Sequence, residues 1–365
     1  AFRDLAVLVG NPSTEFDTWV DQPSQDAYWA AFNPTDDEFV KINMPVLTIT
    51  GHYDGDQPGA MEFYKRHMQH ASEEAKAKHY VILGPWDHGG TRIPVQEFGG
   101  MRFGDAMMFD AFALDKDWYN WTMRDGPRPD FIKDRVTYFV AGNNEWKSAP
   151  SLEDVADRQR VLYLSSNGHA GDVYRSGALD SAPAKGASFD RYVYDPLDTS
   201  KAERAGSPDY IMDQEEVVRT HGDGLIYHSA PFDADTEVTG YIRFDAWIEM
   251  DVPDTDFAVT LYEILPDGGS IALTSQTQRA RYRTSLDRET LITPGEINLY
   301  TFDRFWFFSR LVSKGSRLRL FIRPANRLED QRNYNSGGVV ADETAADAST
   351  ATVKLYHDAD PVSYT

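Results

Sequence analysis

The sequence contains no cysteine among its 365 residues. This absence excludes disulfide bonds, thiol nucleophiles and thiolate metal sites, but it leaves the compartment open, because cysteine-free proteins occur on both sides of a membrane. The sequence also lacks an apolar run of about 18 residues and therefore predicts no membrane-spanning helix. We expect a soluble protein, and these patterns do not decide between a cytoplasmic, a periplasmic and a secreted location.

Positive charge is also scarce. The chain has 36 Lys and Arg residues against 58 Asp and Glu residues, which leaves a formal charge of −22. Such a charge repels nucleic-acid phosphates and anionic lipid headgroups, so we expect no nucleic-acid and no membrane partner. The remaining composition, 41% hydrophobic and 13% aromatic, is that of a globular protein, and its length fits two domains better than one.

Strand-like and helical patterns alternate in the first part of the chain. Strand-like runs lie at residues 44–50 and 79–84, and helical patterns at 60–78 and 104–126. The alternation predicts a parallel sheet covered by helices. Both strand-like runs are apolar throughout, which predicts central strands that are covered on both faces.

The pattern changes after residue 150 to short runs in which apolar and polar residues alternate. These runs lie at residues 160–166, 239–250, 256–276, 296–310 and 316–323. Within the third run, Pro-Asp-Gly-Gly at 266–269 predicts a hairpin turn, and the whole part predicts an antiparallel sandwich of the jelly-roll type. Residues 124–134, which are polar and contain two prolines, are the expected linker.

Two turns in the first part carry an acid and a base. Asp54 lies in TITGHYDGDQPG (48–59) and His88 in VILGPWDHGGTR (81–92), each a few residues after a predicted strand. Functional groups of a parallel sheet collect beyond the carboxyl ends of its strands. A carboxylate there can orient an imidazole and stabilise its charged form. Asp before His is also the order of these residues in α/β-hydrolases that use a serine nucleophile.

Simpler interpretations of the same residues stay open. Asp54 can be an ordinary turn residue, and His88 an ordinary loop histidine. A metal site is a third possibility, because His52, Asp54 and Asp56 lie close together in the sequence. His67 and His70 are three positions apart on a helical pattern, but no H-E-x-x-H motif is present, and we expect these two on a solvated face. We therefore predict no metal.

The chain resembles a known family across nearly its whole length. It is similar, in this order, to the later two thirds of the group that comprises cocaine esterase, α-amino acid ester hydrolase and X-Pro dipeptidyl-peptidase. The segments that carry the resemblance are YWAAFNP, INMPVLTITGHYDGD, VILGPWDHGGTR, WYNWTMRDGP, YFVAGNNEWKSA, TDFAVTLYEILPDGGSIALT, RARYR and GSRLRLFIRPANR.

The resemblance implies an α/β plus all-β fold. It also implies an enzyme that acts on esters or amides through an acyl-enzyme. Residues 1–33 would be the end of a helical cap, 34–130 the later strands and helices of the α/β-hydrolase domain, and 131–365 the jelly-roll sandwich. By motif, Asp54 corresponds to the acid of the catalytic triad and His88 to its base. The family implies no cofactor, and the residues suggest none.

The serine that the resemblance implies is missing from the sequence. No serine lies in a Gly-x-Ser-x-Gly motif, and the nearest match, Ser336 in RNYNSGG, has Tyr334 in place of the first glycine. The chain also begins with AFRDLAVLVG, which has neither an initiator Met nor the order of a signal peptide. We therefore expect the nucleophile in a preceding N-terminal portion of the same enzyme, which would be a partner of this chain.

The expected substrate is a small ester or amide. In the family, the residue two positions after the triad acid faces the acyl pocket. The α-amino acid ester hydrolases carry acids two and three positions after it, as part of a cluster that binds the substrate ammonium. Here Asp56 fits the first position and Gln57 does not fit the second, so α-amino acyl and neutral acyl substrates both stay open. Trp86 is a candidate wall of the pocket, and core packing is its alternative.

A function of another class is a binding module. Jelly rolls often bind carbohydrate, and on this hypothesis residues 150–365 would bind a ligand while the first part would be vestigial. The two hypotheses differ in whether Asp54 and His88 lie within hydrogen-bond reach, which a vestigial segment need not preserve.

Overall fold

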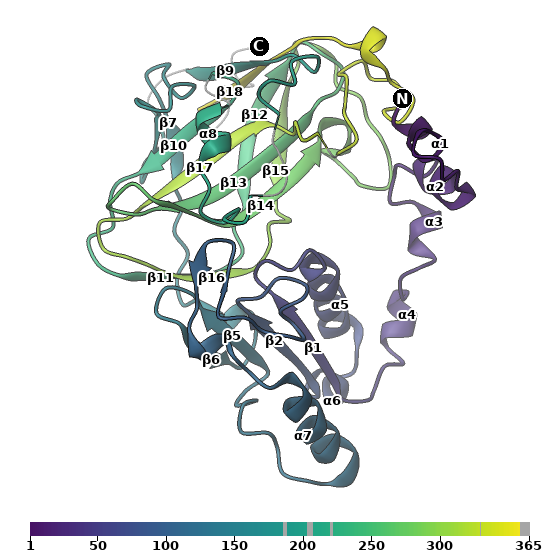
Figure 1. Ribbon diagram of the computed structural model, residues 1–365, viewed down its shortest axis with the longest axis vertical. Coiled ribbons are helices and arrows are strands. Elements are labelled where there is room, and N and C mark those ends of the chain that lie inside the picture. Colours follow the sequence, from purple (N-terminus) through teal and green to yellow (C-terminus); the bar gives the residue numbers. More distant parts are fainter. Residues whose placement is uncertain (185–187, 203–206, 220–221, 329, 358–365) are drawn as a thin grey trace.

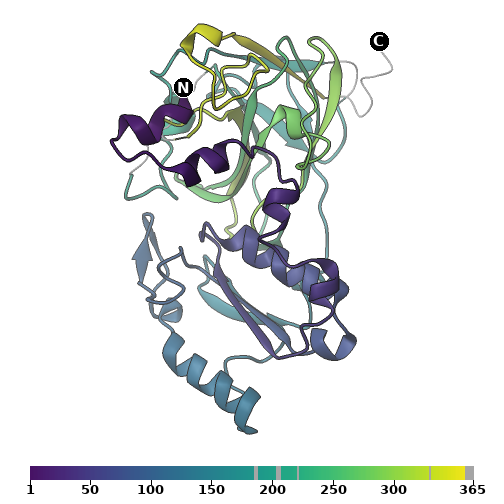
Figure 2. The same ribbon diagram turned by 90° about the vertical axis from the view of Figure 1, so that its right-hand side faces the viewer.

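The structure is a computed structural model that describes residues 1–184, 188–202, 207–219, 222–328 and 330–357. The residues outside these ranges all lie in the predicted second domain. The described residues form an α/β region and a larger β region, which lie one above the other along the long axis of the molecule (Figure 1). The first residues of the chain run along one side, from the β region down to the α/β region (Figures 1 and 2).

These first residues, 1–39, form an N-terminal arm of short helices. The helices are α1 (Leu5–Leu8), α2 (Thr14–Val20), α3 (Ala27–Ala30) and α4 (Asp36–Phe39). The arm contacts the β region where the Arg3 N–H donates to the Ala341 carbonyl (3.0 Å) and the Gln25 N–H to the Leu286 carbonyl (2.8 Å). Helices this short gain little from their own hydrogen bonds, so tertiary contacts hold the arm.

The α/β region is built on a four-stranded sheet with the order β1-β2-β5-β6. Its strands are β1 (Val46–Gly51), β2 (His79–Gly84), β5 (Val136–Val140) and β6 (Glu145–Ala149), and its helices are α5 (Gln57–His70), α6 (Glu73–Lys76) and α7 (Ala111–Arg124). A small hairpin, β3 (Glu97–Phe98) and β4 (Met101–Arg102), lies between β2 and α7. Strands β1, β2 and β5 are parallel, so the prediction of a parallel sheet with helices is confirmed.

Two details of the α/β prediction are wrong. The helical pattern at 60–78 is two helices, because the backbone of Ala71 is extended after α5 and the Ser72 side chain then caps α6. In addition, β1 is an edge strand of the described sheet and pairs only with β2. Residues 46–49 of β1 are accordingly half-buried, whereas residues 81–84 of β2 are buried. An apolar strand pattern reports which residues avoid water and does not say which neighbour covers them.

The β region contains two larger sheets and a two-stranded ribbon. The larger sheets have the orders β14-β13-β17-β10-β8-β7 and β15-β12-β18-β9, and the ribbon is β11-β16. The strands are β7 (Tyr163–Ser165), β8 (Gly177–Asp180), β9 (Phe189–Tyr194), β10 (Leu225–Ser229), β11 (Thr236–Gly240), β12 (Phe244–Met250), β13 (Asp256–Ile264), β14 (Ser270–Arg279), β15 (Ile297–Phe302), β16 (Phe308–Val312), β17 (Arg317–Pro324) and β18 (Ala351–Tyr356). A short helix, α8 (Glu215–Arg219), precedes β10.

The two larger sheets share one hydrophobic core. Residues alternate between buried and exposed along β9, and the ring of Phe257 on β13 packs against Tyr300 and Phe302 on β15, at 5.3 and 6.2 Å between centroids. The hairpin predicted at 266–269 is present between β13 and β14. A β domain after the α/β region is therefore confirmed, while its jelly-roll topology stays a prediction.

The two regions are joined through β5 and the ribbon. The Ala141 N–H donates to the Ser309 carbonyl (3.1 Å), and the Leu311 N–H donates to the Ala141 carbonyl (2.8 Å). Because β5 and β6 belong to the first sheet, that sheet continues to Ala149, beyond the predicted boundary at residue 130. In the described ranges, no helix has the length and apolar character needed to cross a membrane.

Candidate active site

The predicted acid lies in the turn between β1 and α5, which we call the acid turn (residues 51–57). Asp54 is almost fully buried there, and both of its carboxylate oxygens have partners. The Thr50 hydroxyl donates to Oδ2 (3.1 Å), and the Asp56 N–H donates to Oδ1 (3.0 Å). Hydrogen bonds to an ionised carboxylate are strong, so they hold the side chain in one orientation. Sequence reasoning missed Thr50, since a threonine in a strand carries no signal of this role.

The acid turn lies directly against the segment that follows β2. The His52 N–H donates to the Gly84 carbonyl (2.8 Å), and the Tyr53 N–H donates to the Trp86 carbonyl (3.0 Å). This approach requires glycine at position 51, because a Cβ atom there would lie 2.0 Å from the Trp86 carbonyl oxygen. The backbone contacts thus bring the turns that carry Asp54 and His88 together.

His88 meets two carboxylates. Its Nδ1 atom lies 3.2 Å from Asp54 Oδ1 and 3.2 Å from Asp56 Oδ2. Both oxygens can only accept when ionised, so Nδ1 carries a proton and Nε2 of the neutral ring is left as the proton acceptor. The side chain of His88 is 58% exposed, whereas that of Asp54 is 5% exposed. The arrangement is therefore a buried carboxylate that orients an accessible imidazole.

The loop that carries His88 is held by its own side chains. The Gly90 N–H donates to Asp87 Oδ1 (2.8 Å), and the Thr91 hydroxyl donates to the His88 carbonyl (2.8 Å). These contacts close the turn at residues 88–90 and limit the movement of the imidazole.

The same three side chains form a possible cation site. Ligand atoms of Asp54, Asp56 and His88 lie within 4.8 Å of one another, as a divalent cation would need. The set considered from the sequence contained His52 in place of His88. His52 instead lies buried against the ring of Phe307 (5.9 Å between centroids), and burial lowers the pKa of His52 to about 3.

The expectation of a solvated His67 is wrong. Its side chain is buried, and its Nδ1 atom lies 3.0 Å from Nδ1 of His79. The other nitrogen of His67 donates to the Ile42 carbonyl (3.2 Å), and the Thr48 hydroxyl bonds the other nitrogen of His79 (2.9 Å). His67 thus joins α5 to β2 and to Ile42 in the segment before β1, while His79 joins β2 to β1. The helical spacing of histidines did not reveal which face of α5 is covered.

Trp86, predicted as a possible wall of the acyl pocket, has no exposed surface. Its ring stacks on Phe109 (5.2 Å) and contacts Trp146 (5.6 Å between centroids). Core packing, the alternative weighed from the sequence, describes this position. Contact with a substrate stays a prediction that the burial of the ring does not favour.

Comparisons with known proteins match both regions. A family model described as the X-Pro dipeptidyl-peptidase C-terminal non-catalytic domain matches residues 133–358, which is more than half of the chain. The chain belongs to the X-Pro dipeptidyl-peptidase family. The model of the S15 family itself matches residues 5–90, a range that contains both Asp54 and His88. The resemblance described from the sequence is thereby confirmed.

Individual members of the family are similar along nearly the whole chain. Cocaine esterase from Rhodococcus sp. (strain MB1 Bresler) is 26% identical over 349 residues, which are 93% of this chain and 58% of the esterase. The chain therefore spans little more than half the length of this relative.

Solved structures show the same fold. An α-amino acid ester hydrolase superposes with a TM-score of 0.83 at 18% identity, over 98% of this chain and 61% of the other. An aminopeptidase from the marine sediment archaeon Thaumarchaeota archaeon superposes with a TM-score of 0.81 at 20% identity, over 95% and 59%. At this identity the likeness establishes the fold, and activity has to be argued from the site.

Proposed function

We propose that this chain is the acid–base part of a serine hydrolase that cleaves esters or amides through an acyl-enzyme. The observation that carries the proposal is the contact between His88 Nδ1 and Asp54 Oδ1 at 3.2 Å, made beyond the carboxyl ends of adjacent parallel strands. A serine outside this chain would supply the nucleophile. A vestigial segment need not keep this contact, but Asp54 and His88 lie within hydrogen-bond reach of each other.

The proposed mechanism follows from the free nitrogen of His88. Nε2 takes the proton of the serine hydroxyl while the serine oxygen attacks the acyl carbon. His88 then gives that proton to the leaving alcohol or amine, and the acyl group stays on the serine. Water repeats the sequence, with Nε2 as base, and releases the acid and the serine. Throughout, Asp54 orients the ring and stabilises its positive charge.

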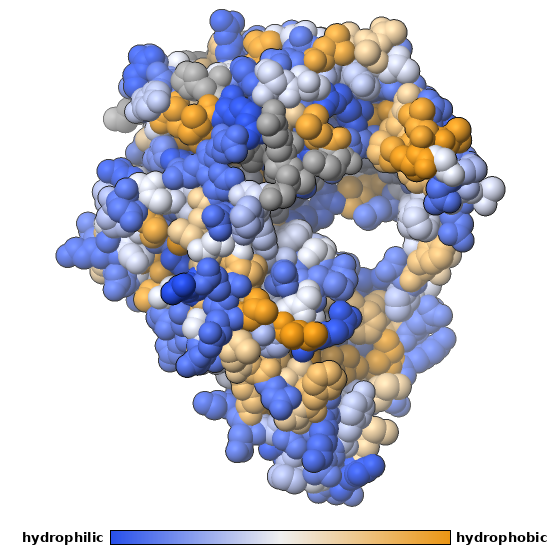
Figure 3. All heavy atoms as spheres, in the orientation of Figure 1, coloured by the Kyte–Doolittle hydropathy of each residue, from blue (hydrophilic) through white to orange (hydrophobic). Residues whose placement is uncertain are grey.

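The proposed partner is the N-terminal portion of the same enzyme. Apolar side chains on and beside α1 are exposed to water, namely Val7 at 68%, Leu8 at 78% and Val9 at 67%. They form an apolar patch over the arm, and an opening lies between the arm and the rest of the molecule (Figure 3). Together with the unpaired edge of β1, this patch is the kind of surface that another folded portion covers.

A fluorophosphonate ester, which labels activated serines, tests the proposal. The purified protein is analysed by denaturing mass spectrometry before and after labelling, both as this chain and with the N-terminal portion present. We expect the label on a serine of that portion, and we expect His88→Ala to prevent labelling. Labelling that His88→Ala leaves unchanged would refute the role of His88. A complete enzyme that takes no label would refute the serine mechanism.

Asp56 is the residue by which we distinguish α-amino acyl from neutral acyl substrates; its side chain is 76% exposed and lies 3.2 Å from His88 Nδ1. A substrate ammonium would form a charge-assisted hydrogen bond with it. We propose small acyl esters or amides as substrates, and the contribution of Asp56 is measured with a phenylglycine ester and its phenylacetic counterpart. A preference for the first that Asp56→Asn removes supports α-amino acyl substrates, whereas equal rates exclude that role for Asp56.

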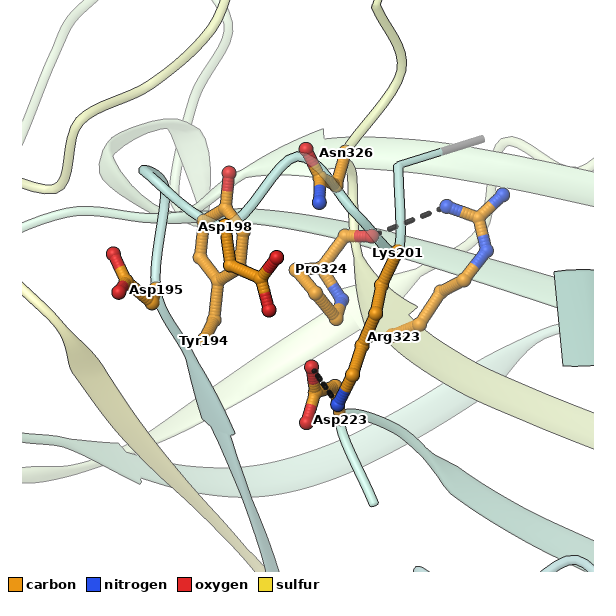
Figure 4. Close-up of a pocket in the computed structure, with 8 residues that line it drawn as sticks. All are labelled: Tyr194, Asp195, Asp198, Lys201, Asp223, Arg323, Pro324 and Asn326. Atoms are coloured by element: carbon orange, nitrogen blue, oxygen red, sulfur yellow. Dashed lines mark hydrogen bonds and ion pairs between the residues drawn. The ribbon is translucent and has the colours of Figure 1, made fainter. Parts of the chain in front are cut away.

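Carbohydrate binding by the β region is the weaker candidate. A pocket in this region is lined by Tyr194, Asp195, Asp198, Lys201, Asp223, Arg323, Pro324 and Asn326 (Figure 4). Lys201 and Asp223 neutralise each other in an ion pair at 2.7 Å. Tyr194, the aromatic residue of the pocket, is buried and offers no face on which a sugar ring could stack.

A further inference from the structure

Gln57 links the acid turn to the β region by hydrogen bonds, beside the ring contact of His52 with Phe307. Gln57, the first residue of α5, is 1% exposed and bonds the backbone of Phe307, which lies between β15 and β16. We infer that Gln57 is a positioning residue through which the β region holds the triad acid in place. The inference rests on the proposed function, and it gives a role in catalysis to the part of the chain that matches a non-catalytic domain.

The amide of Gln57 is fully used by three hydrogen bonds. Its Nε2 donates to the Gly51 carbonyl (2.8 Å) and to the Phe307 carbonyl (3.0 Å), and its Oε1 accepts from the Phe307 N–H (2.6 Å). Gln57 therefore binds Phe307 as a second strand would, through one donor and one acceptor. Both amide atoms are occupied, so the side chain is held between the acid turn and the β region.

Gly51 and Gln57 are the two ends of the acid turn, so the bond between them closes the turn as a ring around Asp54. A second contact inside the ring, from the Gln57 N–H to the Asp54 carbonyl (2.9 Å), fixes the backbone of the acid itself. The carboxylate of Asp54 depends on that backbone, because one of its partners is the Asp56 N–H in the same turn. Loss of the side-chain amide of Gln57 would remove the hydrogen bond to Gly51 that closes the turn.

The segment that Gln57 binds is itself held by the β region. The Arg304 N–H donates to the Gln276 side chain (2.7 Å), and the Thr274 hydroxyl donates to the Trp306 carbonyl (2.9 Å); both partners lie on β14. The ring of Phe307 is buried between Tyr138 of β5 and Tyr241 beside β11. The backbone at Phe307 is therefore a fixed point, against which the acid turn is aligned.

Such alignment affects turnover more than substrate binding. A triad works when its groups keep their geometry within roughly 0.5 Å, and a displacement of about 1 Å costs up to about 100-fold in rate. The side chain of Gln57 is 1% exposed and bonds Gly51 and Phe307, so we expect its loss to lower kcat and to leave KM nearly unchanged. A residue that only stabilised the fold would lower the melting temperature without that effect on kcat.

Two variants of Gln57 and one control separate these roles. Gln57→Met keeps the length of the side chain and loses all three hydrogen bonds. Gln57→Glu places an ionised carboxylate against the Gly51 and Phe307 carbonyls, which repel it unless it is protonated. The control, Thr239→Val, removes a hydroxyl contact with Ser309 (2.7 Å) in the neighbouring ribbon and does not touch the acid turn.

The variants are made in the complete enzyme, and kcat, KM and melting temperature are measured with an aryl ester. We expect Gln57→Met to lower kcat by about 10- to 100-fold with KM within about 2-fold, and Thr239→Val to change neither. The kcat of Gln57→Glu relative to the wild type should rise as the pH is lowered. Equal kcat values for Gln57→Met and Thr239→Val would overturn the inference.

Wild-type activity and the His88→Ala variant report on the proposed function separately. If the wild type shows no hydrolysis, the proposed function fails. The position of the acid turn can then still be followed by nitrogen NMR of the His88 ring. The wild-type ring should hold its proton on Nδ1, and Gln57→Met should give a mixture of both neutral forms. An unchanged spectrum in Gln57→Met would overturn the inference by this second measurement.

Discussion

The site of the α/β region and one ion pair of the β region hold their ionisable groups in different ways. In the α/β region, His88 is largely exposed and its acid is held by a few hydrogen bonds within one turn. In the β region, Arg281 and Asp254 form an ion pair at 2.8 Å in which both side chains are buried. The comparison teaches that the imidazole of His88 is open to another molecule, whereas the buried pair bonds only within the fold.

The buried pair of the β region has further partners. Arg281 donates to the Gly338 carbonyl (2.9 Å), and the Asn333 amide donates to Asp254 (2.7 Å). The pair therefore binds the loop between β17 and β18, which is distant from it in sequence. Burial, together with the nearby charge of Asp256, raises the pKa of Asp254 to about 6 and outweighs the effect of Arg281. The pair is therefore costly to desolvate and costly to break.

The largest effect is expected from the acid of the α/β region. Asp54→Asn removes the charge that stabilises the His88 imidazolium and offers Nδ1 the wrong hydrogen-bond partner, so kcat of the complete enzyme should fall about 10⁴-fold. Asp87→Asn is the matched control, because an amide oxygen can still accept from the Gly90 N–H. Steady-state kinetics measure both, and comparable kcat values in the two variants would contradict the assignment of Asp54.

The next effect concerns stability in the β region. Arg281→Met leaves Asp254 buried without its cation and should lower the free energy of unfolding by about 3–5 kcal/mol in urea titrations. In the control, Arg243→Met, the pair with Asp245 is largely exposed, and the change should stay below about 1 kcal/mol. A loss for Arg281→Met no greater than that of the control would show that buried charge does not organise this region.

A smaller effect concerns the pH dependence of stability in the α/β region. Burial lowers the pKa of His79 from 6.5 to about 3 in the folded protein, so the unfolded chain binds a proton that the folded one rejects. This contribution to stability is complete above the unfolded pKa and is lost as the pH falls. Between about pH 8 and pH 5 it amounts to about 2 kcal/mol. Urea titrations at both pH values should show a smaller loss of stability in His79→Asn than in the wild type. An identical loss in the two proteins would contradict the role given to His79.

The smallest effect tests the exposed surface of the arm. Leu8→Ser changes a side chain that is 78% exposed, so the free energy of unfolding of this chain should change by less than about 0.5 kcal/mol. In the complete enzyme, where we propose that this surface is covered, the same change should cost about 1–2 kcal/mol. Equal, small effects in both proteins would mean that the patch on α1 stays in contact with water.

Local patterns gave the correct elements in both regions. Short apolar runs predicted β1 and β2, helical periodicity predicted α5, and the Pro-Asp-Gly-Gly turn predicted the β13–β14 hairpin. The proximity of Asp54 and His88 could also be predicted, because residues beyond the ends of adjacent parallel strands meet at one edge of a sheet. Their catalytic roles and the domain boundaries stay predictions.

The sequence by itself determined the order of strands and helices, since apolar runs and periodicities of two and 3.6 residues are local patterns. It also determined the edge at which an acid and a base meet, since the ends of adjacent parallel strands lie together. Only the tertiary structure decided that β1 is an edge strand, that His67 and Trp86 are buried, and that Gln57 bonds Phe307. These features depend on neighbours that are distant along the chain, 250 residues in the case of Gln57 and Phe307, and no local pattern of residues encodes such a neighbour.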